Sequence, residues 1–377
     1  MEEMRKVIMV KLLAYYLPQF HEIPENNKFW GKGFTEWTNV RKAKPLYQNH
    51  YQPRVPYQEN YYDLSNPQVM IEQMKLARKY GIYGFCFYHY WFGNGKVLLD
   101  KPLENILKTP EADLPFCISW ANEDWVKTWH GAGGENRLLI KLEYGQEDEW
   151  NRHIEWLLRF FKDDRYIKKD NKPVLLLYNA SIIPNRNKML ALWDKRVKEE
   201  GFDGLWIVAM KRLETDNTRL TGVSANVSFE PRCAKMQMIQ SSNCWFRYKI
   251  KNGEKLSKIP ILRHIIYARF DYDEANQIII NRKHKKNEYR GVFTDYDDTP
   301  RRTKWAHMYK GATPAKFQKY LEANIQKSIE EGNEFLFINA WNEWGEGAYL
   351  EPDERYGYAY LNAVKRVVQK YRKSQDR

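Results

Sequence analysis

The sequence predicts an α/β fold, a closed (β/α)8 barrel, and three observations lead to this prediction. Eight short, apolar, β-rich runs recur along the 377 residues. Segments with helical spacing of apolar residues lie between most of these runs, and such alternation is typical of a parallel sheet. No Gly-rich phosphate loop follows the first run, which argues against a dinucleotide-binding fold. Eight units in one chain favour a closed TIM barrel over an open sheet.

The predicted elements follow one another along the whole chain. The eight predicted strands are Lys11–Tyr16, Ile82–Tyr88, Phe116–Trp120, Val174–Tyr178, Leu205–Ala209, Val223–Phe229, Gly291–Asp295 and Phe335–Ala340. The clearest helical patterns are Pro67–Tyr80, Glu147–Phe161, Lys188–Glu200, Pro314–Glu331 and Tyr358–Tyr371. Because no segment is Gly/Ser-rich or of low complexity, we expect a single domain over residues 1–377.

Two connections between predicted strands are unusually long. Leu17–Asn66 holds five prolines and many aromatic residues, so we expect an ordered loop. Pro231–Tyr289, between the sixth and seventh strands, contains a basic insertion: residues 247–290 carry twelve Lys or Arg against five Asp or Glu. Such an insertion is often simply a solvated face, but it can also make peripheral contact with an anionic membrane surface. Binding to nucleic acid is the least expected of the three.

Composition indicates a globular protein. Hydrophobic residues make up 43% and charged residues 29%, with a formal net charge of +13. Aromatic residues reach 15%, a surplus that suits both a core and a cleft in which sugar rings stack on aromatic faces. Cys86, Cys117, Cys233 and Cys244 form no CxxC pair. The first two lie in apolar, strand-like runs, which indicates buried thiols in a reducing compartment. With neither a signal-peptide pattern nor a membrane-spanning run, we expect a cytoplasmic location, including the inner face of the membrane.

Polar and aromatic residues gather where the predicted strands end, which is where a β/α barrel carries its active site. We expect these residues to bind substrate, although loop anchoring by hydrogen bonds is an alternative for several of them, including Glu36 and His89. The set is Tyr15, Tyr16, Gln19, Glu36, Trp37, His89, Tyr90, Trp91, Trp120, Asn122, Glu123, Asp124, Trp125, Glu230, Asp295, Trp341, Asn342 and Trp344.

The sharpest signal follows the eighth strand, where Glu343 and Glu346 lie on a Gly-rich turn between tryptophans. Glycosidic chemistry needs an acid for the leaving oxygen and a second carboxylate at the sugar. Apolar neighbours raise one carboxyl pKa, and the proximity of two carboxylates separates their pKa values. We therefore predict that these two glutamates are catalytic.

No metal or other cofactor is expected. Asp295, Asp297 and Asp298 suggest either a cation site or salt bridges to Arg301 and Arg302, and we favour the salt bridges. The eight histidines show no HxH or HExxH spacing, which argues against zinc.

Five motifs rich in aromatic and acidic residues follow one another along the chain: AYYLPQFH (14–21), WGKGFTEW (30–37), GFCFYHYWF (84–92), SWANEDW (119–125) and AWNEWGEGAYLEPD (340–353). In this order they resemble the WbsX-type glycosyltransferase-like family, which occurs in surface-polysaccharide gene clusters and is related to glycoside hydrolase family 99. The resemblance covers Ala14 to about Asn362. It implies a (β/α)8 barrel and metal-independent, retaining chemistry like that of endo-acting α-mannosidases.

By this resemblance, Glu346 is the acid/base, and Glu343 assists the sugar's 2-hydroxyl to form a 1,2-anhydro intermediate. Tyr16 matches an active-site tyrosine of the hydrolases. The expected function is therefore making or remodelling glycosidic bonds in bacterial lipopolysaccharide O-antigen or capsule biosynthesis, on an oligosaccharide or lipid-linked glycan. Hydrolysis like that of an endo-α-mannosidase and non-catalytic glycan binding are the two alternatives.

Overall fold

The computed structural model describes residues 9–126, 138–213, 221–256, 259, 268–302 and 305–375. Eight parallel strands close into a barrel, because the first strand pairs with both the second and the last. In order around the barrel they are β1 (Lys11–Tyr16), β2 (Gly84–Gly93), β4 (Phe116–Trp120), β8 (Lys172–Leu177), β9 (Trp206–Lys211), β10 (Ala225–Ser228), β12 (Glu288–Phe293) and β14 (Phe335–Asn339). The predicted (β/α)8 barrel is confirmed.

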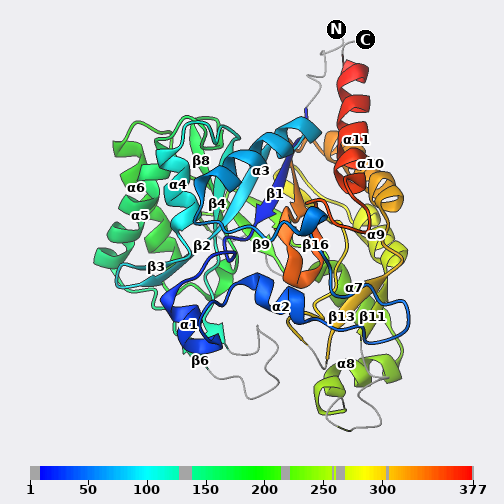
Figure 1. The fold of residues 1–377 in the computed structure, drawn as a ribbon. Coiled ribbons are helices and arrows are strands. Elements are labelled where there is room, and N and C mark those ends of the chain that lie inside the picture. Colours follow the sequence, from blue (N-terminus) through cyan, green and yellow to red (C-terminus); the bar gives the residue numbers. More distant parts are fainter. Residues whose placement is uncertain are drawn as a thin grey trace.

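Helices surround the barrel, as Figure 1 shows. Those that connect successive barrel strands are α3 (Pro67–Tyr80), α4 (Lys101–Lys108), α5 (Glu147–Phe161), α6 (Arg186–Glu199) and α10 (Pro314–Glu330), and α11 (Ala359–Gln375) follows the last strand. Local sequence fixes several of their ends. Asn66 caps α3 through the amide of Gln68, and Gly81 ends it in the left-handed region at φ 93°.

The seventh strand begins earlier than the apolar pattern predicts, at Glu288 instead of Gly291. Its start includes Arg290, which is almost fully buried. The guanidinium of Arg290 forms an ion pair with Glu331 just after α10 and donates to the carbonyl oxygen of Ile279 at 3.0 Å. A charged strand residue is tolerated inside the protein because its charge and donors are satisfied, and a hydrophobicity pattern cannot show this.

The long connection between the sixth and seventh strands is largely helical. It holds α7 (Arg232–Ser241), α8 (Cys244–Leu256), the short strand β11 (Ala268–Asp271) and α9 (Tyr272–Asn281). β11 pairs with β13 (His307–Lys310), and these elements enclose a second apolar cluster around Phe270 and Tyr309. The basic insertion is thus attached to the barrel by a core of its own.

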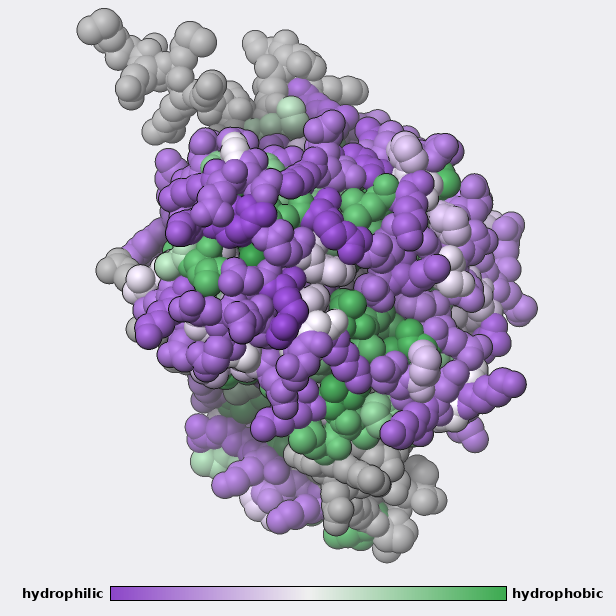
Figure 2. Space-filling model, turned by 90° about the vertical axis from the view of Figure 1, so that its left-hand side faces the viewer, coloured by the Kyte–Doolittle hydropathy of each residue, from purple (hydrophilic) through white to green (hydrophobic). Residues whose placement is uncertain are grey.

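Alternate residues of the barrel strands point inward and outward. Tyr15 lies inside, where its ring stacks with those of Tyr88 and Phe337 at centroid distances of 5.8 and 5.6 Å. The next residue, Tyr16, lies outside and donates to Gln73 of α3 at 2.5 Å. Helices cover the outer side, so both strand faces are apolar. The outer surface seen in Figure 2 is mainly hydrophilic, with small hydrophobic groups between the charged side chains.

Candidate active site

Glu343 and Glu346 lie in a tight hairpin at the carboxyl end of β14. The hairpin consists of β15 (Asn342–Glu343), the short 3₁₀ helix η4 (Trp344–Glu346) and β16 (Ala348–Tyr349). Gly347 allows the turn because its φ of 62° is in the left-handed region. The side chain of Glu343 is 8% exposed and that of Glu346 is 25% exposed. One carboxyl group is therefore enclosed, and the other reaches solvent.

A single guanidinium joins three carboxylates at this hairpin. Arg301, from the segment between β12 and β13, donates through its Nη2 to Glu343 Oε2 at 2.9 Å and through its Nη1 to Glu346 Oε1 at 2.7 Å. Its Nε donates to Glu36 Oε1 at 2.7 Å. Glu36 is the first residue of α2 (Glu36–Lys42) and is fully buried. Segments near both ends of the chain thus meet at one cation.

The close approach of Glu36 depends on a glycine in the hairpin. A Cβ atom added to Gly345 would lie 1.7 Å from Oε1 of Glu36. Any side chain at position 345 would therefore displace this carboxylate. The Gly residues of the hairpin have two distinct uses: Gly347 makes the turn, and Gly345 makes room for Glu36.

The electrostatics of the site favour the protonated form of Glu343. Burial raises the pKa of Glu343 to about 8; the positive charge of Arg301 opposes this shift, and the negative charges of Glu346 and Glu36 add to it. Near neutral pH the carboxyl group of Glu343 therefore still holds a proton.

Tyrosines and a lysine surround the pair. Burial raises the pKa of Tyr88 and Tyr90, and in both cases the nearby charge of Glu343 raises it further. Burial likewise raises the pKa of Tyr296, with the charge of Glu346 next in effect. Lys235 of α7 is also close: burial lowers its pKa to about 8, against the attraction of Asp298. Hydroxyl donors and a titratable amine thus face the acidic centre.

Comparison with known proteins identifies the family. The model of the family described as "Glycosyltransferase WbsX" matches residues 12–364. This chain belongs to the WbsX glycosyltransferase family. The family resemblance expected from the sequence motifs is thereby confirmed, and it classes the chain with carbohydrate-active enzymes.

Curated relatives of this WbsX-family chain include the uncharacterized protein WxcX of Xanthomonas campestris pv. campestris. It is 34% identical over 361 residues, covering 95% of this chain and 49% of WxcX. The chain thus spans about half the length of the curated relatives that it matches.

Solved structures share the barrel fold at low sequence identity. A glycoside hydrolase-like protein superposes with a TM-score of 0.56 at 12% identity, covering 96% of this chain and 95% of that one. An endo-α-mannosidase of glycoside hydrolase family 99 from Bacteroides thetaiotaomicron superposes with a TM-score of 0.53 at 12% identity, covering 97% and 98% of the two chains. These similarities establish the fold.

Buried neighbours hold the glutamate hairpin of this WbsX-family chain in place. Arg54 donates to the carbonyl oxygen of Gly347 at 3.0 Å and pairs with Asp295 at 2.8 Å. The Trp344 indole donates to Glu351 at 2.6 Å, and its ring stacks on Tyr349 at 3.8 Å. The tryptophan expected to flank the carboxylates is therefore fully buried and fixes the loop.

Among the residues predicted to bind substrate, Glu36 shares Arg301 with the carboxylate pair, and Tyr90 lies near enough for the charge of Glu343 to raise its pKa. Trp125 lies behind Tyr90, with its ring edge-on at 5.5 Å, and Tyr15 lies below, against Tyr88. These four side chains remain candidates for shaping the site.

A second group of the predicted residues points away from the barrel interior. His89 stacks on Trp156 of α5 at 4.3 Å, and Trp91 stacks on His153 of the same helix at 4.5 Å. Tyr16 and Trp120 also face outward: the first donates to Gln73, and the second packs against Trp193 of α6. Trp341 packs against Phe85, also on the outer side. The structure does not bring these side chains to the carboxylates.

A third group consists of residues that connect loops, which is the alternative the sequence left open. Asn342 bonds both backbone groups of Leu17, at 2.7 and 3.0 Å. Glu230 forms an ion pair with Arg282 and accepts from the Ala234 amide at the start of α7. The remaining members make comparable contacts: the Gln19 carbonyl accepts from Glu36, Trp37 donates to Tyr62, Asn122 and Glu123 bond Asn179, Asp124 accepts from Leu142, and Asp295 pairs with Arg54.

The aspartates after the seventh strand are bonded within the protein. Asp298 pairs with Arg302 at 3.1 Å, whereas Asp297 accepts from Gln52 at 2.7 Å and lies 2.7 Å from His50. Arg301 pairs with the glutamates instead. Within the described residues, no three His, Cys, Asp or Glu side chains are grouped to hold a metal ion.

Sequence reasoning missed the role of Arg301 as the centre of the site. The sequence does show Arg301 shortly after the seventh strand and beside a second arginine. It does not show which carboxylates Arg301 pairs with, because Glu36 and Glu343 lie 265 and 42 positions away. Tyr296 and Lys235 were likewise absent from the predicted set.

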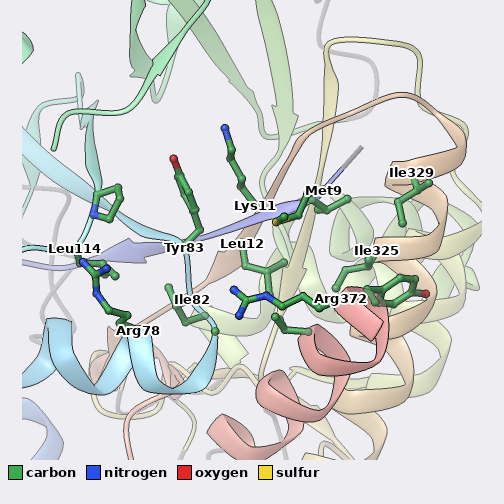
Figure 3. A pocket seen from close by; sticks show the side chains of 15 residues that line it. Met9, Lys11, Leu12, Arg78, Ile82, Tyr83, Leu114, Ile325, Ile329 and Arg372 are labelled. Carbon is green, nitrogen blue, oxygen red and sulfur yellow. The ribbon is translucent and has the colours of Figure 1, made fainter. Parts of the chain in front are cut away.

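A cavity of about 200 Å³ lies elsewhere, at the amino ends of β1 and β2 (Figure 3). Apolar side chains such as Leu12, Ile82 and Ile325 line it together with Arg78 and Arg372. None of its described lining residues is an acid, so it does not belong to the candidate active site.

Proposed function

We propose that this chain makes or remodels glycosidic bonds in surface-polysaccharide assembly, by a retaining, metal-independent mechanism that uses Glu343 and Glu346. The observation that carries the proposal is the coupling of both carboxylates through Arg301 at the carboxyl end of the barrel. Two carboxyl groups held by one guanidinium can supply the acid and the base that glycosidic chemistry needs. Membership of the WbsX family supports sugar transfer as the overall reaction.

In the proposed first step, Glu346 takes over the proton that Glu343 holds in the free protein. It donates this proton to the glycosidic oxygen as the bond from that oxygen to the anomeric carbon breaks. Glu343 takes the proton of the sugar's 2-hydroxyl, whose oxygen attacks the anomeric carbon and gives a 1,2-anhydro sugar. In the second step an acceptor hydroxyl attacks the same carbon, the bond from that carbon to the 2-oxygen breaks, and the acceptor passes its proton to Glu346. Glu343 then returns the proton to the 2-oxygen, which restores both the sugar and the enzyme.

The difference in exposure supports these two roles. Glu346, 25% exposed, lies where a leaving group departs and an acceptor enters, whereas Glu343, 8% exposed, lies deeper against the tyrosines. The proposed substrate is an oligosaccharide or a lipid-linked glycan, handled at the cytoplasmic face of the inner membrane. Hydrolysis is the second candidate, because the same exposure of Glu346 lets water act as the acceptor.

The test is incubation of wild type, Glu346→Gln and Glu354→Gln with α-linked mannosides and related glycans, with and without a lipid-linked acceptor. Glu354 is an exposed glutamate of the same loop that accepts from the Gln58 amide, so Glu354→Gln is a matched control. With the acceptor present, mass spectrometry should detect a product from wild type and from Glu354→Gln but not from Glu346→Gln. Without the acceptor, no product should appear. Free reducing sugar without acceptor would establish a hydrolase instead. Equal glycan binding without any product would favour the binding-protein alternative.

A glycosyl fluoride separates the roles of the two glutamates. Fluoride leaves without protonation, so the first step no longer needs the acid. We expect the fluoride to restore bond cleavage in Glu346→Gln but not in Glu343→Gln. The reverse pattern would exchange the two roles.

A further inference from the structure

Helix α8 (Cys244–Leu256) is attached to the rest of the molecule by one face. Phe246 packs edge-on against Phe270 with ring centroids 5.6 Å apart, and Ile250 joins the same apolar cluster. Gly253 lies so close to Trp305 that an added Cβ would be 2.1 Å from the indole ring. These positions recur at intervals of three and four residues, so one side of α8 is fixed on the protein.

The opposite face of α8 carries large aromatic side chains in water. Trp245 is 68% exposed and Tyr248 is 51% exposed, and their rings stack with centroids 5.9 Å apart and an interplanar angle of 18°. Ile259, shortly after the helix, is 45% exposed. Among the large hydrophobic residues of the described chain, Trp245 has the highest exposed fraction. Folding of this chain alone does not account for such a surface.

Exposed cations accompany the aromatic pair. Lys251 and Lys255 follow Tyr248 by three and seven positions, which places them on the same side of the helix. Arg247 is exposed as well. An outward face with tryptophan, tyrosine and cations is typical of a helix that lies in the interfacial region of an anionic membrane.

The position of α8 relates this surface to the candidate active site. In Figure 1, α8 lies at the same end of the molecule as α1 (Pro24–Trp30) and α2, whereas both termini lie at the opposite end. Trp305, on which α8 rests, is four residues after Arg301. Helix α8 therefore lies at the end of the molecule that holds the glutamates (Figure 1).

We infer that the outer face of α8, formed by Trp245, Arg247, Tyr248, Lys251 and Lys255, docks on an anionic lipid bilayer. Docking places the barrel mouth next to glycans that are anchored in the membrane, and this second point rests on the proposed function. An anionic bilayer is the occupant that fits an exposed tryptophan and tyrosine pair flanked by cations.

Vesicle sedimentation with the full chain tests the docking surface directly. The vesicles contain phosphatidylcholine alone or with 30 mol% phosphatidylglycerol, in 0.1 M and 0.5 M NaCl. We expect binding only with phosphatidylglycerol and much less at 0.5 M salt. Each lysine near such a surface contributes about fivefold in affinity, so Lys251→Gln/Lys255→Gln should lose roughly twentyfold. Trp245→Ser/Tyr248→Ser should lose binding to a similar extent.

Matched controls come from other parts of the surface. Lys188→Gln/Lys195→Gln removes two exposed lysines from α6, and Tyr57→Ser/Tyr358→Ser removes another exposed ring pair, at 5.5 Å. Both controls should bind vesicles as wild type does. The inference would be overturned if the control variants lost as much vesicle binding as the α8 variants. It would also be overturned if wild type bound a single-stranded RNA oligonucleotide and not the vesicles.

These experiments test membrane docking and catalysis independently of each other. Vesicle binding needs no turnover, so it can be present in a chain that lacks glycosidic activity. The α8 variants should keep wild-type activity on a soluble glycan and lose activity only on a glycan anchored in phosphatidylglycerol vesicles. Loss on both substrates would place α8 in the active site and not at a membrane.

Discussion

Arg301 should set the pH range in which the glutamate pair works. Its guanidinium lies 2.9 Å from Glu343 and 2.7 Å from Glu346, and a positive charge stabilises the ionised form of both carboxyl groups. In Arg301→Gln this stabilisation is lost, and Glu343 holds its proton to higher pH. The alkaline limb of the kcat/KM profile should therefore move to higher pH.

The size of the shift follows from the geometry. An opposite charge within 4–6 Å lowers a carboxyl pKa by about 1–3 units. With the pKa of Glu343 raised to about 8, the wild-type protein should lose the proton that the first step uses, and its activity, above about pH 8. In Arg301→Gln this alkaline limb should move up by about 1–3 pH units, equivalent to about 1.4–4 kcal/mol.

The assay is the pH dependence of kcat/KM, which reports the pKa values of the free enzyme. Arg301→Lys keeps the positive charge, so its alkaline limb should stay near that of wild type even if kcat falls. Arg302→Gln is a matched control, because this neighbouring arginine pairs with Asp298 instead. A folded Arg301→Gln protein whose alkaline limb stays at wild-type pH would refute the reasoning.

Three further predictions concern the hairpin and its supports. Gly345→Ala should displace Glu36, whose Oε1 would lie 1.7 Å from the new Cβ, and kcat should fall about 100-fold in steady-state assays. Arg54→Met leaves Asp295 without its cation at 2.8 Å, so urea unfolding should show a loss of about 3–5 kcal/mol. Burial raises the pKa of Glu351 to about 7, above its unfolded value, so its contribution to stability is full below about pH 4.3 and is lost as pH rises through 7. Between pH 4 and 8 the free energy of unfolding of wild type should therefore fall by up to about 3 kcal/mol more than that of Glu351→Gln.

The strand faces show where sequence reasoning about the site reached its limit. In β2, Tyr88 and Tyr90 face the barrel interior, whereas His89 and Trp91 pack on α5. An alternating apolar and polar pattern would have told these faces apart. Strands of a parallel barrel are buried on both sides, so aromatic residues occupy both faces and the sequence does not show which set points inward.

The sequence by itself determined the barrel and the glutamate pair. Eight β-rich runs with helices between them leave few other folds, and Glu343 and Glu346 are neighbours on one turn, so their proximity is local. Tertiary structure alone decided their electrostatic partner: Arg301 meets Glu36 across 265 positions. That contact depends on barrel closure and on the room left by Gly345. A one-dimensional pattern therefore identifies the acid pair but not the charge that controls it.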